Sequence, residues 1–383
     1  MSAASLPITR SSDPPVLPGI YVHLPYCRVR CGYCTFVVST NASSANSYQD
    51  ALAREIALLA PEAEGVEFDS LYLGGGTPSL TPAPELARLL EGLRERFHVR
   101  PGAEVTLEAN PEDVSPATAR DWAAAGVTRV SVGVQSFDDR ELAAVGRSHD
   151  AAAARRALET LGGNGLSISG DLILGLPEQT AESLRASLEQ LCRSGAGHVS
   201  VYLLEGERSK AMPRDRRLSD DAQADLWLET GEKLAREGFL HYEISNWARP
   251  GQEARHNVKY WKRAPTLGLG VSAHELWEGR RRANVSALVR YIEELAAGRR
   301  PVALDRPVSR EEGARERLFL GLRLSEGVPA GEIEDFVRGS ADPTLPGDYA
   351  SWREGGLLEE ASGRLRLTER GCLVSNEILC RFV

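Results

Sequence analysis

Short, mostly apolar runs alternate with longer amphipathic segments over the first half of the chain. The segments between the runs, such as 48–59 and 85–97, carry leucine and alanine at helical spacing. Six repeats of strand and helix predict a parallel sheet with helical crossovers, either an open doubly wound sheet or a barrel-like one. The strand-length runs lie at residues 20–23, 70–73, 105–108, 130–134, 168–174 and 199–203.

The pattern becomes less regular after residue 218. Residues 219–238 predict one amphipathic helix with Ser219 as its N-cap and Gly238 as its stop, and residues 241–244 predict a further strand. Two helices, a hairpin and a last helix then follow, in an order that is typical of a small winged-helix-like module. Their expected positions are residues 309–321, 330–337, 357–359, 364–367 and 368–380.

The composition is that of a globular chain, since 42% of the 383 residues are hydrophobic and 26% are charged. The formal net charge of −9 argues against broad electrostatic capture of nucleic acid or anionic lipid. Residues 1–19 contain four prolines and no apolar core of signal-peptide length, and no run of about 18 apolar residues occurs anywhere. We therefore expect a cytoplasmic protein with a flexible lead over residues 1–18, no membrane span and no nucleic-acid partner.

Three of the six cysteines crowd into eight positions directly after the first predicted strand, at Cys27, Cys31 and Cys34. Six cysteines in a chain of this length are too few for a disulfide scaffold, and thiols stay reduced in the cytoplasm. Three thiolates on one loop suit a [4Fe–4S] cluster, which normally takes four cysteine ligands. With three ligands one iron stays open, and S-adenosylmethionine can chelate it through its amino and carboxylate groups. An electron from the cluster can then cleave the sulfonium bond and produce a radical.

Two other interpretations of these cysteines stay open, namely a zinc site and coincidence. Zinc prefers a closed tetrahedral set, and the sequence holds no second C-x₂-C knuckle, although His23 is a candidate fourth ligand. The remaining cysteines, Cys192, Cys372 and Cys380, are isolated, and we expect them to be packing residues.

Polar and glycine-rich groups follow the predicted strands at the ends where parallel sheets carry their functional loops. Residues 74–78 read Gly-Gly-Gly-Thr-Pro, which suits either a tight turn or the close approach of backbone to a ligand. Glu108 closes the third strand, where a carboxylate can accept hydrogen bonds from ribose hydroxyls or an ammonium group. Asp171 is a charged residue inside an apolar strand and needs a partner or a ligand. Gln135 follows the fourth strand, and the forked donors of Arg147 suit a carboxylate.

The segment Tyr21-Val-His-Leu-Pro-Tyr-Cys27-x₃-Cys31-x-Tyr33-Cys34 resembles the start of the radical SAM family, and specifically of its porphyrin branch. That branch holds the oxygen-independent coproporphyrinogen III oxidases and the HemW heme chaperones. The resemblance covers nearly the whole chain, from about residue 19 to residue 383. It implies an α/β fold with a partial (βα)₆ TIM-like barrel over residues 19–218, a barrel extension over 219–304 and a C-terminal winged-helix-like α+β domain of the HemN type over 305–383.

The resemblance also assigns the cofactor contacts. In this family the glycine-rich motif holds the amino end of S-adenosylmethionine, and Tyr21 and Tyr33 match residues beside the cluster. The cluster ligands are expected to be Cys27, Cys31 and Cys34. Contacts with S-adenosylmethionine are expected from Gly76, Thr77, Glu108, Gln135, Arg147 and Asp171.

Two functions compete within this branch. The oxidase converts propionate side chains to vinyl groups by radical hydrogen abstraction and decarboxylation, and its motif is typically followed by a fourth cysteine two residues after the third. Phe36 stands at that position here. The oxidase also carries a longer N-terminal segment, whereas about 20 residues precede the first predicted strand here. Both departures favour the heme chaperone, which would bind heme and deliver it to an acceptor protein.

His256-Asn-Val-Lys-Tyr-Trp261 matches the HNxxYW motif of HemW-like proteins. A histidine near two large aromatic rings can ligate heme iron while the rings pack on the macrocycle. Within the resemblance we expect His256 to handle heme, and the alternative is a hydrogen-bonded histidine beside a core tryptophan. Nearby basic residues would neutralise heme propionates or form a solvated face, namely Lys259, Lys262, Arg263 and residues 280–282.

A third hypothesis is a zinc-bearing regulator whose C-terminal wing contacts DNA. The net charge is unfavourable for such a protein, and the wing is only moderately basic. Metal content separates the hypotheses, because the two porphyrin-related functions require an iron–sulfur cluster and the regulator requires zinc.

Overall fold

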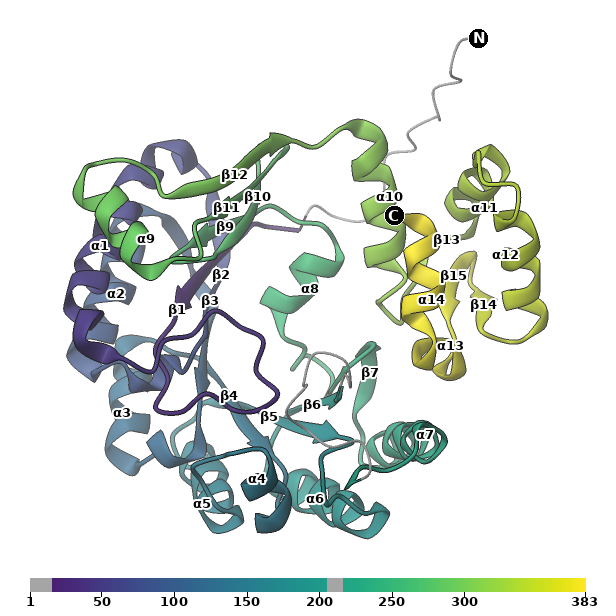
Figure 1. Ribbon diagram of the computed structural model, residues 1–383, viewed down its shortest axis with the longest axis horizontal. Coiled ribbons are helices and arrows are strands. Elements are labelled where there is room, and N and C mark those ends of the chain that lie inside the picture. The colour runs from purple at the N-terminus through teal and green to yellow at the C-terminus, as the bar shows by residue number, and fades with distance from the viewer. Residues whose placement is uncertain (1–15, 205–215) are drawn as a thin grey trace.

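The computed structural model describes residues 16–204 and 216–383 (Figure 1). Most of the flexible lead predicted over residues 1–18 therefore lies outside the described residues.

Six parallel strands form the centre of the fold, in the same order in space as in sequence. They curve into part of a barrel, and helices cover the outer face (Figure 1). The alternating pattern is thus confirmed as an α/β fold with a partial barrel. The strands are β1 (Gly19–Leu24), β2 (Glu67–Gly75), β3 (His98–Ala109), β4 (Arg129–Gln135), β5 (Ser167–Leu174) and β6 (His198–Leu203). The helices are α1 (Ala45–Leu59), α2 (Ala83–Arg96), α3 (Pro116–Ala125), α4 (Asp139–Ala144), α5 (Ala151–Gly162) and α6 (Ala181–Arg193).

The sheet continues on both sides of these strands and reaches twelve strands within the described residues. Beyond β1 comes the parallel β9, followed by three antiparallel strands, and beyond β6 two short antiparallel strands form the other edge. The added strands are β7 (Leu240–Glu243), β8 (Asn246–Ala248), β9 (Thr266–Leu269), β10 (His274–Trp277), β11 (Arg280–Asn284) and β12 (Val302–Pro307). The added helices are α7 (Asp220–Arg236), α8 (Arg255–Trp261) and α9 (Leu288–Ala296).

The predictions for this region are partly confirmed. Ser219 caps α7, because its hydroxyl oxygen accepts a hydrogen bond from the Ala222 amide at 3.2 Å. β7 lies one residue from the predicted strand. Strands β10 to β12 were not predicted, because charged residues such as those at 280–282 interrupt any apolar pattern. The domain limits stay a prediction. Strand β12 spans the predicted limit between residues 304 and 305.

A small module of helices around a three-stranded sheet follows β12. It has its own hydrophobic core, which includes Ile333, Leu365 and Phe382. The predicted hairpin is confirmed, but the single helix predicted over 368–380 is wrong. Two short helices replace it, because the chain leaves helical geometry at Val374 (φ −111°, ψ 20°). The elements are α10 (Arg310–Gly321), β13 (Val328–Pro329), α11 (Ala330–Gly339), α12 (Leu345–Glu354), β14 (Leu358–Ala361), β15 (Arg364–Leu367), α13 (Glu369–Leu373) and α14 (Ser375–Leu379).

Side chains of the central strands alternate between two environments. One set points outward and packs into the main core, as Leu71, Leu107 and Val132 do. The other set points to the inside of the curved sheet, where most of its members are polar. Successive side chains of a strand point to opposite faces, so the inner set recurs at every second residue. The fold thereby gathers polar groups from several strands in one place.

Candidate functional site

The inner faces of β3 to β6 line a cavity of about 510 Å³, a volume typical of small-molecule sites. The loop between β1 and α1 forms another wall, and α8 contributes Asn257. Most of the strand residues that line the cavity alternate along their strands. They are Tyr72 and Gly75 in β2, Thr106, Glu108 and Ala109 in β3, Arg129, Ser131, Gly133 and Gln135 in β4, Ser169, Asp171 and Ile173 in β5, and His198, Ser200, Tyr202 and Leu203 in β6.

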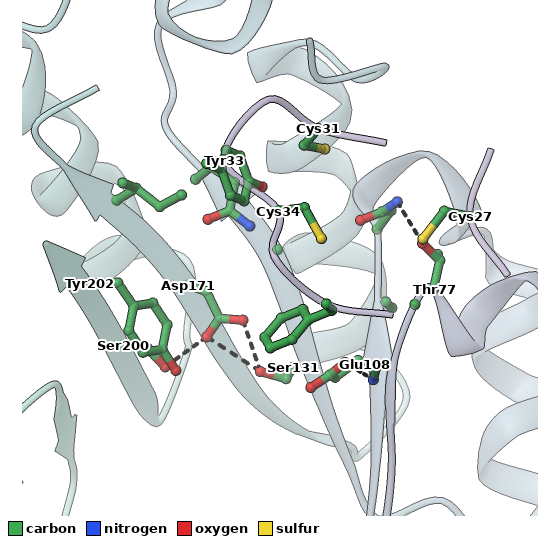
Figure 2. A pocket seen from close by; sticks show the side chains of 18 of the residues that line it. Cys27, Cys31, Tyr33, Cys34, Thr77, Glu108, Ser131, Asp171, Ser200 and Tyr202 are labelled. Atoms are coloured by element: carbon green, nitrogen blue, oxygen red, sulfur yellow. Dashed lines mark hydrogen bonds between the residues drawn. The ribbon is translucent and has the colours of Figure 1, made fainter. Parts of the chain in front are cut away.

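All three predicted cluster cysteines line this cavity (Figure 2). The Thr77 hydroxyl donates a hydrogen bond to Cys27 Sγ at 3.3 Å, and Arg147 Nη1 donates to Cys31 Sγ at 3.6 Å. Such donors stabilise the thiolate form that binds metal. Among the described residues, no three His, Cys, Asp or Glu side chains converge closely enough to hold a single ion. Three cysteines on the wall of one cavity supply the ligands that a [4Fe–4S] cluster with one open iron requires.

The cysteine loop is fastened to the glycine-rich turn that follows β2. The Gly76 amide donates to the Leu24 carbonyl and the Thr77 amide donates to the Tyr26 carbonyl, each at 2.8 Å. A Cβ atom on Gly76 would lie 2.6 Å from the carbonyl carbon of Pro25, so the loop backbone leaves no room for a side chain. Gly76 and Thr77 both line the cavity, and their predicted contact with S-adenosylmethionine stays a prediction.

His23 fastens the far end of the same loop. Its Nε2 donates to the Val37 carbonyl at 2.9 Å, which leaves Nδ1 to accept a hydrogen bond from the Tyr21 hydroxyl at 2.9 Å. Both ring nitrogens are therefore engaged, and the zinc alternative finds no free histidine nitrogen here. Tyr21 does not line the cavity; its ring stacks on Tyr72 at 6.1 Å between centroids and supports the loop from behind.

Glu108 is held at the end of β3 by two donors. The Tyr72 hydroxyl donates to Oε1 at 2.7 Å and the Gly75 amide donates to Oε2 at 3.0 Å. Burial raises the pKa of the Glu108 carboxyl to about 7, although both hydrogen bonds work in the opposite direction. The carboxyl thus changes its charge close to neutral pH while it faces the cavity.

Asp171 finds the partners that a buried carboxylate requires. The Ser200 hydroxyl donates to Oδ1 at 2.7 Å and the Ser131 hydroxyl donates to Oδ2 at 3.0 Å (Figure 2). Burial raises the pKa of this carboxyl above its ordinary value. In register, Asp171 is paired with Ser200, so neighbouring strands place both side chains on the inner face.

Arg147 joins the loop to the strand ends. Its Nη2 donates to Asn110 Oδ1 at 2.7 Å and to the Gly133 carbonyl at 2.8 Å, while Nη1 lies 3.4 Å from the Tyr33 hydroxyl. Tyr33 packs against a small apolar cluster that includes Ile173 and Leu204. These contacts place the Arg147 guanidinium between the cysteine loop and the ends of β3 and β4.

Gln135 ends β4 with a backbone φ of 65°, in the left-handed region that residues other than glycine rarely adopt. The pairing of β4 with β5 shifts register between Val132 and Gln135. The strain turns the end of the strand, and Gln135 lines the cavity as predicted.

His256 lies outside the cavity and is fully buried. Ser70 Oγ lies 2.9 Å from Nδ1 and the Tyr260 hydroxyl lies 3.0 Å from Nε2, while the ring stacks on Tyr72. Burial lowers the pKa of His256 to about 3, so the ring is neutral. This geometry corresponds to the hydrogen-bonded alternative, although the packed aromatic ring is Tyr72. A role of His256 in heme handling stays a prediction.

The basic residues expected around heme propionates are paired with carboxylates of the chain. Arg263 and Arg281 both contact Glu316, and Lys259 contacts Asp69. The other three pairs are Lys262–Glu326, Arg280–Asp305 and Arg282–Glu275. The propionate interpretation of these residues is therefore not supported, because their charges are already neutralised within the protein.

The other three cysteines do not line the cavity. Cys192 is buried in the main core, and Cys372 packs between the two cores, as predicted. The packing prediction is wrong for Cys380, which is exposed because it lies at the surface end of α14.

Sequence reasoning missed three residues that position the predicted ones. The Tyr72 hydroxyl donates to Glu108, and the Ser131 and Ser200 hydroxyls donate to Asp171. Asn110, which accepts a hydrogen bond from Arg147, follows the third predicted strand, where functional loops were expected. Ser131 and Ser200 occupy the inner positions of their strands, two or more residues before the strand ends. The signal that could have found them is the period-two recurrence of polar residues within each strand, because alternate residues of a strand point to the same face.

Comparisons with known proteins agree with this fold. The profile of the radical SAM superfamily matches residues 21–191, and that of the HemN C-terminal domain matches residues 308–374. A solved structure of coproporphyrinogen III oxidase (HemN) from Escherichia coli shares the fold, with a TM-score of 0.81 over 97% of this chain and 91% of that one, at 23% identity.

Relatives named heme chaperone HemW match nearly the whole chain. The protein from Mycobacterium tuberculosis is 36% identical over 94% of this chain and 93% of its own length. The protein from Escherichia coli is 31% identical over 95% of this chain and 97% of its own length. Membership of the radical SAM superfamily brings with it a [4Fe–4S] cluster and S-adenosylmethionine, for which the three cysteines and the cavity provide a fitting site. The chain belongs to the HemW family of heme chaperones, a branch of the radical SAM superfamily.

Proposed function

We propose that this protein is a heme chaperone that binds heme, holds a [4Fe–4S] cluster with S-adenosylmethionine beside it, and passes the heme to an acceptor protein. The observation that carries the proposal is the 30 to 36% identity with proteins named heme chaperone HemW over nearly the full length of both chains. The presence of Phe36, where the oxidases typically carry a fourth cysteine, points the same way.

Specific residues serve each part of the cofactor site. Cys27, Cys31 and Cys34 would each bind one iron, and the open iron, when S-adenosylmethionine is bound, supplies one-electron chemistry at the sulfonium. Thr77 and Arg147 direct their donors at two of the sulfurs. For S-adenosylmethionine, we propose that Glu108 and Asp171 accept hydrogen bonds while Gly76, Gln135 and Arg147 shape the pocket. Tyr33 would cover the cluster side of that pocket.

The setting of the protein is also a proposal. No helix in the described parts of the chain is long and apolar enough to span a membrane. We propose a cytoplasmic location, where the three cluster thiols stay reduced. The DNA-binding alternative loses support in the wing itself, because Arg366 pairs with Glu359 at 2.7 Å. We also propose that the chain is divided as the sequence indicates, into a lead over residues 1–18, a barrel over 19–218, a barrel extension over 219–304 and a C-terminal domain over 305–383.

A transfer experiment tests the proposal. The protein is reconstituted with iron and sulfide without oxygen, loaded with hemin, freed of excess hemin by gel filtration and mixed with an apo heme protein. We expect saturable loading, followed by the acceptor's own Soret spectrum and loss of heme from the chain. Absence of saturable hemin binding by the reconstituted protein would overturn the proposal.

A further inference from the structure

The mouth of the cofactor cavity carries exposed apolar side chains. Val29 and Phe36 come from the cysteine loop and are 51% and 63% exposed, and Tyr202 and Leu203 come from the end of β6 and are 43% and 39% exposed. All four line the cavity. We call them the apolar rim. A soluble protein seldom gathers large apolar side chains at one opening unless the opening binds something.

The two sides of the rim are joined beneath the surface. Tyr33 of the cysteine loop packs against Leu204, which directly follows the rim residues of β6, and against Ile173. The two sides of the mouth are therefore held together by a buried apolar cluster.

A cation without a carboxylate partner stands at the same mouth. Arg30 is exposed and lines the cavity, and its Nη2 donates only a long hydrogen bond, 3.4 Å, to the Cys34 carbonyl. Among the described residues, no carboxylate lies within ion-pair distance of Arg30, in contrast to the paired cations around α8 and β11. An apolar rim beside one free guanidinium is complementary to a flat apolar molecule that carries a carboxylate.

Within the described part of the chain, no histidine that lines the cavity has a ring nitrogen without a hydrogen-bonding partner. His198 is the one histidine among these lining residues, and its two ring nitrogens lie 2.6 Å from Ser169 Oγ and 2.8 Å from the Tyr242 hydroxyl. His256 is fully buried and engaged in the same way.

We propose that heme docks on the apolar rim, with one propionate at Arg30 and the macrocycle over Phe36 and Tyr202, held without a histidine from this chain. This proposal replaces the heme-handling role that the family resemblance implied for His256. The inference rests on the proposed heme function and adds the binding site. Because the contacts involve the ring face and the carboxylate, the metal-free porphyrin should bind almost as well as heme.

The test uses the chain with its reconstituted cluster, without oxygen. Hemin is titrated by difference absorbance and protoporphyrin IX by its fluorescence. We expect the two Kd values to agree within about threefold, and Phe36→Ser with Tyr202→Ser to weaken both by about tenfold or more, the loss typical of large aromatic contacts. Val289→Ser removes an equally exposed apolar side chain on α9 and should change neither Kd.

The Arg30 contact is tested by changing the protein and the ligand, first singly and then together. Arg30→Gln should weaken protoporphyrin IX binding, and the dimethyl ester of protoporphyrin IX should bind the unmodified protein with a similar loss. The two changes together should weaken binding no further, because they remove the same contact. The Arg30 comparison still tests the proposal if the variant with Phe36→Ser and Tyr202→Ser retains too little iron for its Kd values to be compared with those of the unmodified protein.

His256→Gln preserves hydrogen-bonding groups in the buried position and should leave the hemin Kd unchanged. If hemin binding falls with His256→Gln, or if protoporphyrin IX does not bind, an iron ligand holds the heme and the rim proposal is overturned while the heme function stands. Equal binding by the rim variants overturns it in the same way. If the unmodified protein binds no hemin, the proposed function fails and the rim proposal fails with it.

Discussion

At the scale of the residue, the cavity depends on polar side chains that stand at inner strand positions and satisfy one another. Asp171 illustrates this, because the Ser131 and Ser200 hydroxyls on the two neighbouring strands supply the donors that its buried carboxylate needs. The sequence predicted Asp171 as a site residue from its charge within an apolar strand. It could not identify the two serines as its partners, since that requires knowing which strands are neighbours.

Glu108 gives a pH-dependent prediction. Its pKa in the fold, about 7, is above the ordinary value of 4.5, so the fold favours the protonated carboxyl. The unfolded chain therefore releases this proton at lower pH, and stability falls as pH rises from about 4.5 to 7, by up to roughly 3 kcal/mol. Glu108→Gln carries no charge, so its stability relative to the unmodified protein should increase between pH 5 and pH 8.

Thermal or urea unfolding at several pH values measures this difference. Glu91→Gln, which removes an exposed carboxyl on α2, serves as the control and should show a constant difference. A Glu108→Gln difference that stays flat over the same range would contradict a raised pKa.

The cysteines give a second prediction at this scale. Replacing Cys27, Cys31 or Cys34 singly with serine should lower iron from about four atoms per chain and remove the visible absorbance of the cluster. Cys380→Ser changes an exposed cysteine that does not line the cavity, and it should keep full iron content. Iron analysis after anaerobic reconstitution decides, and one zinc per chain in the unmodified protein would favour the zinc alternative instead.

At the scale of the element, the cysteine loop is positioned by a turn that is distant in sequence. The amides of Gly76 and Thr77 extend the pairing of β1 with β2 into the loop, and His23 fastens its other end at Val37. The sequence indicated a glycine-rich turn for close approach to a ligand. In the structure the glycine-rich turn also lies close to the backbone of the cysteine loop. This contact follows from the pairing of β1 with β2, which the sequence does not show.

Gly76→Ala tests this role of the turn. The added Cβ would lie 2.6 Å from the Pro25 carbonyl carbon and 2.7 Å from the Leu24 oxygen, so the loop must shift. We expect lower cluster retention and a lower melting temperature. Gly92→Ala on α2 meets no atom within 4 Å and should stabilise the protein by about 0.5 to 1 kcal/mol. Full iron content in the Gly76→Ala variant would contradict the close contact.

Elements were predictable where the hydrophobic period was clear. The six central strands and the helices between them have the apolar runs and helical spacing that the pattern reports. Strand β11 (Arg280–Asn284) is mostly arginine, because its side chains pair with acidic neighbours instead of filling a core. Ion pairs between distant segments leave no periodic signal, so these strands could not be predicted.

At the scale of the whole molecule, the C-terminal module is joined to the sheet by charged contacts. Glu316 of α10 is largely buried and accepts a hydrogen bond from Arg263 Nε at 2.5 Å and another from Arg281 of β11. His241 of β7 contacts Glu369 of α13 at 3.1 Å. The sequence indicated the module and its wing, but the surface on which it packs depends on side chains of β7, β11 and α10 that have no pattern in common.

Glu316→Gln should weaken this junction. Removing the charge leaves two arginines without their shared carboxylate, and because both are partly exposed we expect a loss of about 1 to 2 kcal/mol. Glu311→Gln breaks an exposed pair with Arg315 on the same helix and should cost about 0.3 to 0.5 kcal/mol. Urea unfolding compares the two variants, and equal losses would show that Glu316 has no special role in the junction.

The central claim is that the molecule handles heme with a radical SAM site and does not oxidise a porphyrinogen. One anaerobic preparation with its cluster, S-adenosylmethionine and a reductant is titrated in parallel with hemin and with coproporphyrinogen III, and products are followed by mass spectrometry. The account predicts saturable hemin binding and no decarboxylated product. Decarboxylation of coproporphyrinogen III without saturable hemin binding would contradict it.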